Sequence, residues 1–341
     1  MQHRIIGNSL QIRFIQPGTR FKTDPHASGW QPLAIRNRRQ PALRHSLSFF
    51  DEGEVMISAQ QARFYAHHGF VVVDNLFDAA KVGEAIRAID ELLDPANLGK
   101  AFEMEPQDGA TVRRIWSPTQ KHEVFERLAA DSALLDCIQQ LIGDDVMFHY
   151  SKINMKGPKM GSIVKWHQDF SYYPHTNSDL VTALIFLDDA TRENGCLRVI
   201  PGSHRRGLRS HEIDGYFRGT VQDVAEAEAV EVEVQSGGVL FLHCLTLHAS
   251  ARNTSNLPRR TFLPAYRAAD SFPIYFGPHA AHNEPGVRLL RGQASRVARV
   301  EAGLHHLPIA ERDFGSLYEV QEGSHLNKQM SDMESAGYAV A

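Results

Sequence analysis

The sequence predicts a mainly β core with flanking helices, an α+β arrangement in which most strands follow the helices along the chain. Helical periodicity is concentrated between residues 56 and 144. Beyond Asp145 the pattern changes to short β-branched and aromatic runs separated by glycine, proline and asparagine. Helices followed by many short strands favour an antiparallel sandwich or barrel with a helical flank.

The helices are predicted from their caps and from their apolar periodicity. Ser58 and Gln61 have the spacing of a capping box and predict a helix to about His67, which Gly69 ends. A buried strand should follow over Phe70–Val73. Three further helices are predicted, over Asp78–Leu93, Glu123–Ala130 and Ser132–Ile142.

The strands are predicted from short apolar runs between turn residues. The runs are Val146–Met155, Ser162–Trp166, Leu180–Leu187, Cys196–Ile200, Val230–Val234, Val239–Leu242 and Arg260–Ala265. Asn194-Gly195 and Gly237-Gly238 are typical turn formers between them. After about Gly292 the pattern fades, and Ser295–Leu307 is expected to be helical or loose.

The domain organisation follows from these elements and from charge. The first fifty residues hold eight basic residues and one acid, so they carry about +7, whereas the whole chain carries −4. We expect residues 1–55 to be a disordered extension or a segment before the true start at Met56; prolines and glycines argue against a helical transit peptide. Residues 56–292 form the predicted domain, helical over 56–144 with a β core over 145–270, and 293–341 a partly helical tail.

Composition excludes several classes of protein. A net charge of −4 argues against a nucleic-acid partner, and no apolar stretch reaches the roughly 18 residues of a membrane span. Cys137, Cys196 and Cys244 fit no C-x-x-C zinc pattern and cannot all pair, which favours a reducing, cytoplasmic compartment. The oligomeric state stays open.

A metal site is predicted from Trp166-His-Gln-Asp169. Residues two apart in a strand point to the same side, so His167 and Asp169 can converge on one ion. The strand-like run from Val239 offers a third ligand, either His243 or His248. Two histidines and one carboxylate on a β scaffold form the facial triad of non-haem iron(II) enzymes, which leaves three coordination positions open.

A cation follows the distal histidine. Arg259 stands eleven residues beyond His248, at the start of the next predicted strand. Its guanidinium can bind the remote carboxylate of a dicarboxylate in bidentate fashion, with Ser250 or Thr254 as a hydroxyl partner.

These motifs resemble those of the phytanoyl-CoA dioxygenase family over roughly Met56 to Pro278. The matching stretches run from Trp166 to Pro174, from Leu187 to His204 and from Gly238 to Ser250. The resemblance implies a double-stranded β-helix, a jelly-roll core of the cupin type. It also implies Fe(2+), the co-substrate 2-oxoglutarate and O2 as cofactors.

The same resemblance assigns residues to these cofactors. It implies His167, Asp169 and His248 as the iron ligands and, for 2-oxoglutarate, Arg259 with Ser250 as its hydroxyl partner. Less directly, it places four further residues in the 2-oxoglutarate pocket, namely Gln168, Asn154, Met147 and Arg114.

The substrate is the least determined part. Tyr172, Tyr173 and His175 follow the H-x-D motif and are expected to overhang the iron, and Tyr266 and Arg267 lie near the last core strand. We expect hydroxylation of an aliphatic C–H bond of a small-molecule substrate, with release of succinate and CO2. The alternatives are an acyl-CoA hydroxylase and, from another class, a non-catalytic metal-binding jelly-roll module.

Overall fold

The structure is a computed structural model that describes residues 3–6, 57–94, 102–105, 108–161, 163–275, 286–303 and 305–310. All of these residues belong to one compact unit, Met1–Ser9 with Val55–Ala341. Of the predicted N-terminal extension, only His3–Ile6 is described, as strand β1. The rest of residues 1–55, and the tail beyond residue 310, lie outside the described residues.

The predicted helices are confirmed within a residue or two. They are α1 (Ala59–His68), α2 (Ala79–Leu92), α3 (Glu123–Ala129) and α4 (Ser132–Ile142). Ser58 forms the expected capping box, in which its Oγ accepts from Gln61 N (3.2 Å) and Gln61 Oε1 accepts from Ser58 N (3.0 Å). Gly69 ends α1 with a φ of 82°, which glycine adopts without strain.

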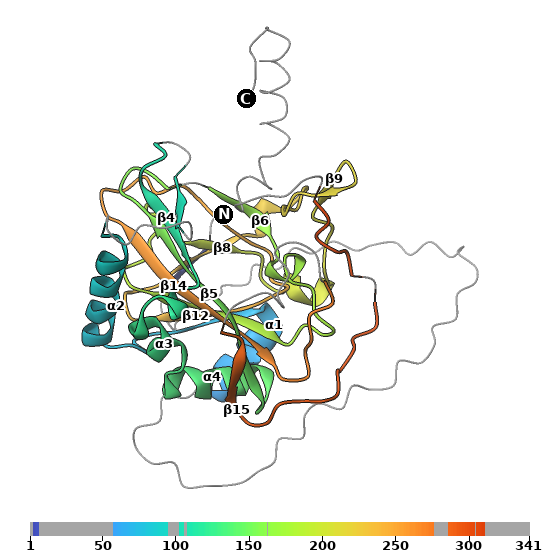
Figure 1. Ribbon diagram of the computed structural model, residues 1–341. Helices are drawn as coiled ribbons and strands as arrows, with labels where there is room; N and C mark the ends of the chain where they lie inside the picture. Colours follow the sequence, from blue (N-terminus) through green and yellow to red (C-terminus); the bar gives the residue numbers. More distant parts are fainter. Residues whose placement is uncertain are drawn as a thin grey trace, which may run out of the picture. The chain divides into compact units, whose positions relative to one another are not determined.

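A large antiparallel sheet of eight strands is the main element of the fold (Figure 1). Its path is β2-β12-β7-β14-β5-β4-β3, and β15 also pairs with β5. The strands are β2 (Phe70–Val73), β12 (Val239–His243), β7 (Leu180–Phe186), β14 (Arg259–Ala268), β5 (Val146–Lys156), β4 (Val112–Trp116), β3 (Phe102–Met104) and β15 (Arg288–Arg291).

A second sheet has the order β1-β11-β8-β13-β6. Its strands besides β1 are β11 (Val230–Glu233), β8 (Leu197–Val199), β13 (His248–Ser250) and β6 (Val164–His167). A separate hairpin joins β9 (Glu212–Ile213) to β10 (Tyr216–Phe217). The two predominantly antiparallel sheets and the helical flank agree with the predicted fold class.

Two hydrophobic cores lie on opposite faces of the large sheet. One packs α2, α3 and α4 against it, for example Phe125 on Phe262 with ring centroids 5.1 Å apart (Figure 1). The other joins Leu263 and Leu184 of the large sheet to Val199 and Val232 of the second sheet. Because neighbouring strand residues face opposite ways, Phe262 and Leu263 belong to different cores.

Several strands were not predicted from sequence. β3 and β4 fall inside the region expected to be helical, and β13, β15 and the β9–β10 hairpin were also missed. Between Ser295 and Leu307 the described residues form no helix, but an extended strap that hydrogen-bonds back to the core, for example from Arg299 N to Asp270 O (3.0 Å). The strap and β15 cannot be predicted from local periodicity, because both depend on distant partners: β15 pairs with β5, and the strap bonds to Asp270 and Thr176.

Candidate active site

Three side chains that can bind a metal converge between the two sheets. His167 ends β6, His248 begins β13, and these two residues are direct partners in the second sheet. Asp169 follows β6 in a short 3-10 helix. Asp169 Oδ1 lies 3.6 Å from Nε2 of His167 and 3.8 Å from Nε2 of His248, and one ligand atom from each residue lies within 4.8 Å of the others.

Backbone carbonyls determine which histidine nitrogens face the centre. Nδ1 of His167 donates to Lys165 O (2.8 Å), and Nδ1 of His248 donates to Thr246 O (2.9 Å). A carbonyl can only accept, so in the neutral ring the proton is on Nδ1 and the lone pair is on Nε2. Both lone pairs therefore face Asp169, as metal ligands require.

Charge states in the centre also suit a cation. Burial, with the neighbouring His167, lowers the pKa of His248 to about 3 and keeps its ring neutral. Burial alone would raise the pKa of Asp169, but the two histidines and Lys152 outweigh it and hold that pKa well below its usual range. Thr182 Oγ1 donates to Asp169 Oδ2 (3.2 Å), which orients the carboxylate. Two imidazoles and one carboxylate suit iron(II).

A cavity extends from this centre to Arg259. Ser250, Asn154 and Arg114 line the same cavity, so it gathers four of the six residues predicted for the co-substrate. Arg259 is 6% exposed and donates through Nη1 to Gly195 O (2.6 Å).

The end of the cavity near Arg259 is rich in cations. Arg114 Nε donates to Asn154 Oδ1 (2.8 Å), and Arg114 and Arg113 both pair with buried Glu103. Lys156, the direct strand partner of Arg259, donates through Nζ to Ala251 O (2.7 Å). This arrangement suits a carboxylate ligand.

Seven of the predicted site residues do not line this cavity, and Gln168, Tyr266 and Met147 are three of them. Gln168 is fully buried, and its amide donates to Gly207 O (2.9 Å) and Leu245 O (2.7 Å). It therefore stabilises the segments around Gly207 and Leu245 instead. Tyr266 lies in the helix-side core and donates to Ala129 O (2.8 Å), because it is on the opposite face of β14 from Arg259. Met147 lies near the far end of β5, paired with Arg267.

The remaining predicted substrate residues lie on the other side of the metal centre. The Tyr172 ring is 5.8 Å from that of His167, and its hydroxyl donates to Gly219 O (2.6 Å). Tyr173 and His175 are buried beside His149, with ring centroids 4.8 Å and 5.1 Å from it. Arg267 is near them and is 7% exposed.

Sequence reasoning missed Thr182, Lys152 and Lys156, which line the cavity. The signal for the two lysines was present, because they share the face of β5 that carries Asn154. Thr182 had no such signal, since only the folded chain brings β7 to Asp169.

No helix among the described residues has both the length and the apolar composition of a membrane span.

Comparison with known proteins identifies the enzyme class. A probable alpha-ketoglutarate-dependent hypophosphite dioxygenase of Stutzerimonas stutzeri is 31% identical over 233 residues, which are 63% of this chain and 80% of that protein. Crystal structures of EctD from S. alaskensis, one with bound Fe and one with 2-oxoglutarate and 5-hydroxyectoine, are 28% identical. Their TM-scores are 0.57 and 0.56, and each alignment covers 75% of this chain and 91% of that one.

These findings confirm the predicted class and cofactors, a non-haem iron dioxygenase that uses 2-oxoglutarate. The model of the family described as "Phytanoyl-CoA dioxygenase (PhyH)" matches residues 65–261, more than half of the chain. The chain therefore belongs to the phytanoyl-CoA dioxygenase family.

Proposed function

We propose that this dioxygenase hydroxylates an aliphatic C–H bond of a small-molecule substrate, with His167, Asp169 and His248 as its iron ligands. One observation carries the assignment: the three ligand atoms lie within 4.8 Å of one another in a cavity that also contains Arg259 and Ser250. Three donors on one side of an ion leave positions for a chelating 2-oxo acid and for dioxygen.

The protein's own groups position the reactants. The Arg259 fork binds the 5-carboxylate of 2-oxoglutarate, and Ser250 donates a hydrogen bond to the same group. Thr182 holds the Asp169 carboxylate in place. When bound, iron(II) and 2-oxoglutarate supply the oxidising chemistry, in which one atom of dioxygen enters succinate, the other enters the substrate, and CO2 is released.

Two relatives favour a compact substrate over an acyl-CoA. The relatives named above are a hypophosphite dioxygenase and a protein crystallised with 5-hydroxyectoine, and both compounds are small.

The assignment is tested with the anaerobic protein. Iron(II) with 2-oxoglutarate should give a weak charge-transfer band at roughly 500 nm, because three open positions permit chelation. Asp169→Ala should lose this band and the slow release of succinate that occurs without substrate. Asp188→Ala, a change to a residue that pairs with Arg260 and does not line the cavity, should keep both. Wild-type turnover in Asp169→Ala would disprove the ligand assignment.

A further inference from the structure

Arg267 is a buried cation that no acid neutralises in the part of the chain described here. It is 7% exposed, and burial lowers its pKa. Its Nη1 donates to the carbonyl oxygens of Ala268 and Ser271, and no carboxylate of the described residues forms an ion pair with it. By contrast, the buried Arg114 pairs with Glu103. A buried guanidinium normally has an anionic partner, because an isolated charge in a protein interior is costly.

Two buried imidazoles accompany Arg267. His149 is 2% exposed, His175 is fully buried, and their rings are 5.1 Å apart. Nε2 of each ring is buried without a hydrogen-bond partner among the described residues. His175 Nδ1 donates to Tyr173 O (2.6 Å), so its Nε2 is a free acceptor in the neutral ring. The positive charge of Arg267 contributes to a low pKa in both rings, after burial itself.

This cluster lies on the opposite side of the metal centre from Arg259. Thr182, which hydrogen-bonds Asp169, is the strand partner of Ala265. Arg267 is the next residue on the same face of β14, about 7 Å farther along the strand. From Ala265, Arg259 is three same-face positions away in the opposite direction along β14. Two cations therefore flank the metal centre along one strand, and Arg259 already serves the co-substrate.

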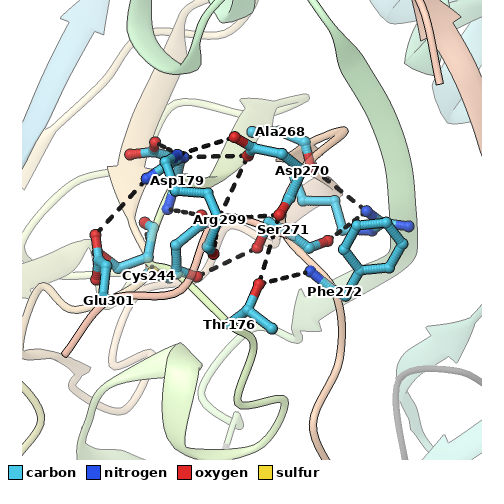
Figure 2. A network of polar contacts seen from close by, with 12 residues as sticks. Thr176, Asp179, Cys244, Ala268, Asp270, Ser271, Phe272, Arg299 and Glu301 are labelled. Atoms are coloured by element: carbon cyan, nitrogen blue, oxygen red, sulfur yellow. Dashed lines mark hydrogen bonds and ion pairs between the residues drawn. The ribbon is translucent and has the colours of Figure 1, made fainter. Parts of the chain in front are cut away.

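The segments that carry the cluster are bound firmly to each other. Figure 2 shows the polar network around Thr176, Asp270 and Ser271. Thr176 follows His175 in the sequence, and Asp270 and Ser271 follow Arg267. Thr176 N donates to Phe272 O (2.8 Å), and Ser271 Oγ donates to Asn177 O (3.2 Å). Such bonds preorganise the cluster, which lowers the entropic cost of binding a ligand there.

We infer that the substrate carries an oxyanion, a carboxylate or a phosphorus oxyanion, that binds Arg267 and His149, with an adjacent O–H or N–H that donates to His175. The inference rests on the proposed function and specifies its substrate class. The oxyanion neutralises Arg267. Because Arg267 lies one strand step from the metal centre, the substrate must be compact, with the oxidised carbon near the anionic group.

The experiment uses the anaerobic enzyme loaded with iron(II) and 2-oxoglutarate. Acetate, glycolate and methylphosphonate serve as oxyanion probes, and acetamide serves as their neutral counterpart. Binding is followed by the thermal midpoint and by perturbation of the charge-transfer band, since a ligand that binds only the folded state raises its midpoint. Arg267→Met is compared with Arg260→Met, a change to another arginine of β14, which pairs with Asp188 on the other face.

At least one oxyanion should raise the wild-type midpoint without displacing 2-oxoglutarate, whereas acetamide should not. Arg267→Met should weaken that binding by about tenfold or more, the effect of one charged hydrogen bond, and Arg260→Met should leave it unchanged. Arg267→Lys, which keeps the charge, should retain part of it. The free Arg267→Met protein should be no less stable than wild type, because it loses an uncompensated buried charge.

Three results would overturn the inference. They are unchanged oxyanion binding in Arg267→Met, oxyanions that bind only in competition with 2-oxoglutarate, and no response of the wild type to any of the three anions. If the charge-transfer band itself fails to form, the proposed iron site is wrong. The thermal midpoints of the metal-free protein then still show whether Arg267 binds anions.

Discussion

Tyr266 and Arg267 are adjacent, yet they lie on opposite sides of β14. Tyr266 is part of the helix-side core and hydrogen-bonds Ala129, whereas Arg267 shares a face with Arg259. Both were predicted to line the substrate site, which strand alternation does not allow. The same alternation explains Gln168, which lies between His167 and Asp169 and therefore points away from the metal centre.

Tyr266→Phe tests the structural role of this tyrosine. The change removes the bond to Ala129 and should lower the free energy of unfolding by about 1 kcal/mol, the usual net value of one buried hydrogen bond. The kcat and the KM for 2-oxoglutarate should not change. Urea unfolding and steady-state succinate release measure both effects, and Tyr216→Phe, at an exposed position, is the matched control. A changed KM with unaltered stability would return Tyr266 to the site.

Arg259→Lys tests the co-substrate assignment. Lysine keeps the charge but lacks the planar fork that binds a carboxylate through two parallel hydrogen bonds. The KM for 2-oxoglutarate should therefore rise by about tenfold or more, with a smaller effect on kcat. Arg260→Lys, one residue along and paired with Asp188, should leave the KM unchanged. An unaltered KM in Arg259→Lys would mean that another cation holds the 5-carboxylate.

At the scale of elements, the strap after β15 secures the end of the roll near Arg267. Arg299 forms ion pairs with Asp270 (2.9 Å) and with Asp179, and Ser178 donates to Glu301 (2.9 Å) (Figure 2). The strap thereby links the loop that follows the H-x-D motif to the turn after β14. Local periodicity does not predict the strap, because Asp179 and Asp270 are 120 and 29 residues away from Arg299 in the chain.

Arg299→Ala should loosen both segments. The pairs are partly exposed, so the expected loss of stability is only about 1 kcal/mol. Hydrogen exchange should nevertheless quicken at Thr176 and Phe272, whose amides bond within the linked segments. Arg291→Ala removes the ion pair between Arg291 of β15 and Asp136 of α4, and it should leave these amides protected. Equal protection in both variants would show that the strap does not hold the turn.

For the whole molecule, buried histidines predict a loss of stability in acid. Burial lowers the pKa of His175 to about 4 and that of His211 to about 3. An unfolded histidine binds its proton near pH 6.5, whereas these two stay neutral in the folded state until the pH is far lower. Their contribution to stability is therefore complete above about pH 6.5 and is lost as the pH falls toward 4.

At pH 5 each of these histidines should lower the free energy of unfolding by about 2 kcal/mol relative to neutral pH. Urea unfolding of the metal-free protein at several pH values from 7.5 to 5, roughly, measures the slope. His175→Gln, which does not titrate, should flatten it, while His306→Gln, at an exposed position, should not. A wild-type slope in His175→Gln would show that His175 is not a neutral buried group.

The sequence by itself determined the chemistry and the class of fold. Local rules were sufficient for the capped helices, for the longer core strands and for the H-x-D pair, because these depend on neighbours within a few residues. The choice of His248 over His243 and the role of Arg259 needed the family resemblance. Their placement around one cavity agrees with that choice.

Only the tertiary structure decided what surrounds these residues. The hydrogen bond from Thr182 to Asp169, the cations on β5 and the burial of Arg267 beside two histidines arise from pairings between distant strands. No local pattern encodes such contacts, because they depend on sheet order and register. Alternation along β14 places Tyr266 and Arg267 on opposite faces, but which of these faces lies toward the metal centre is decided only once the strands pair.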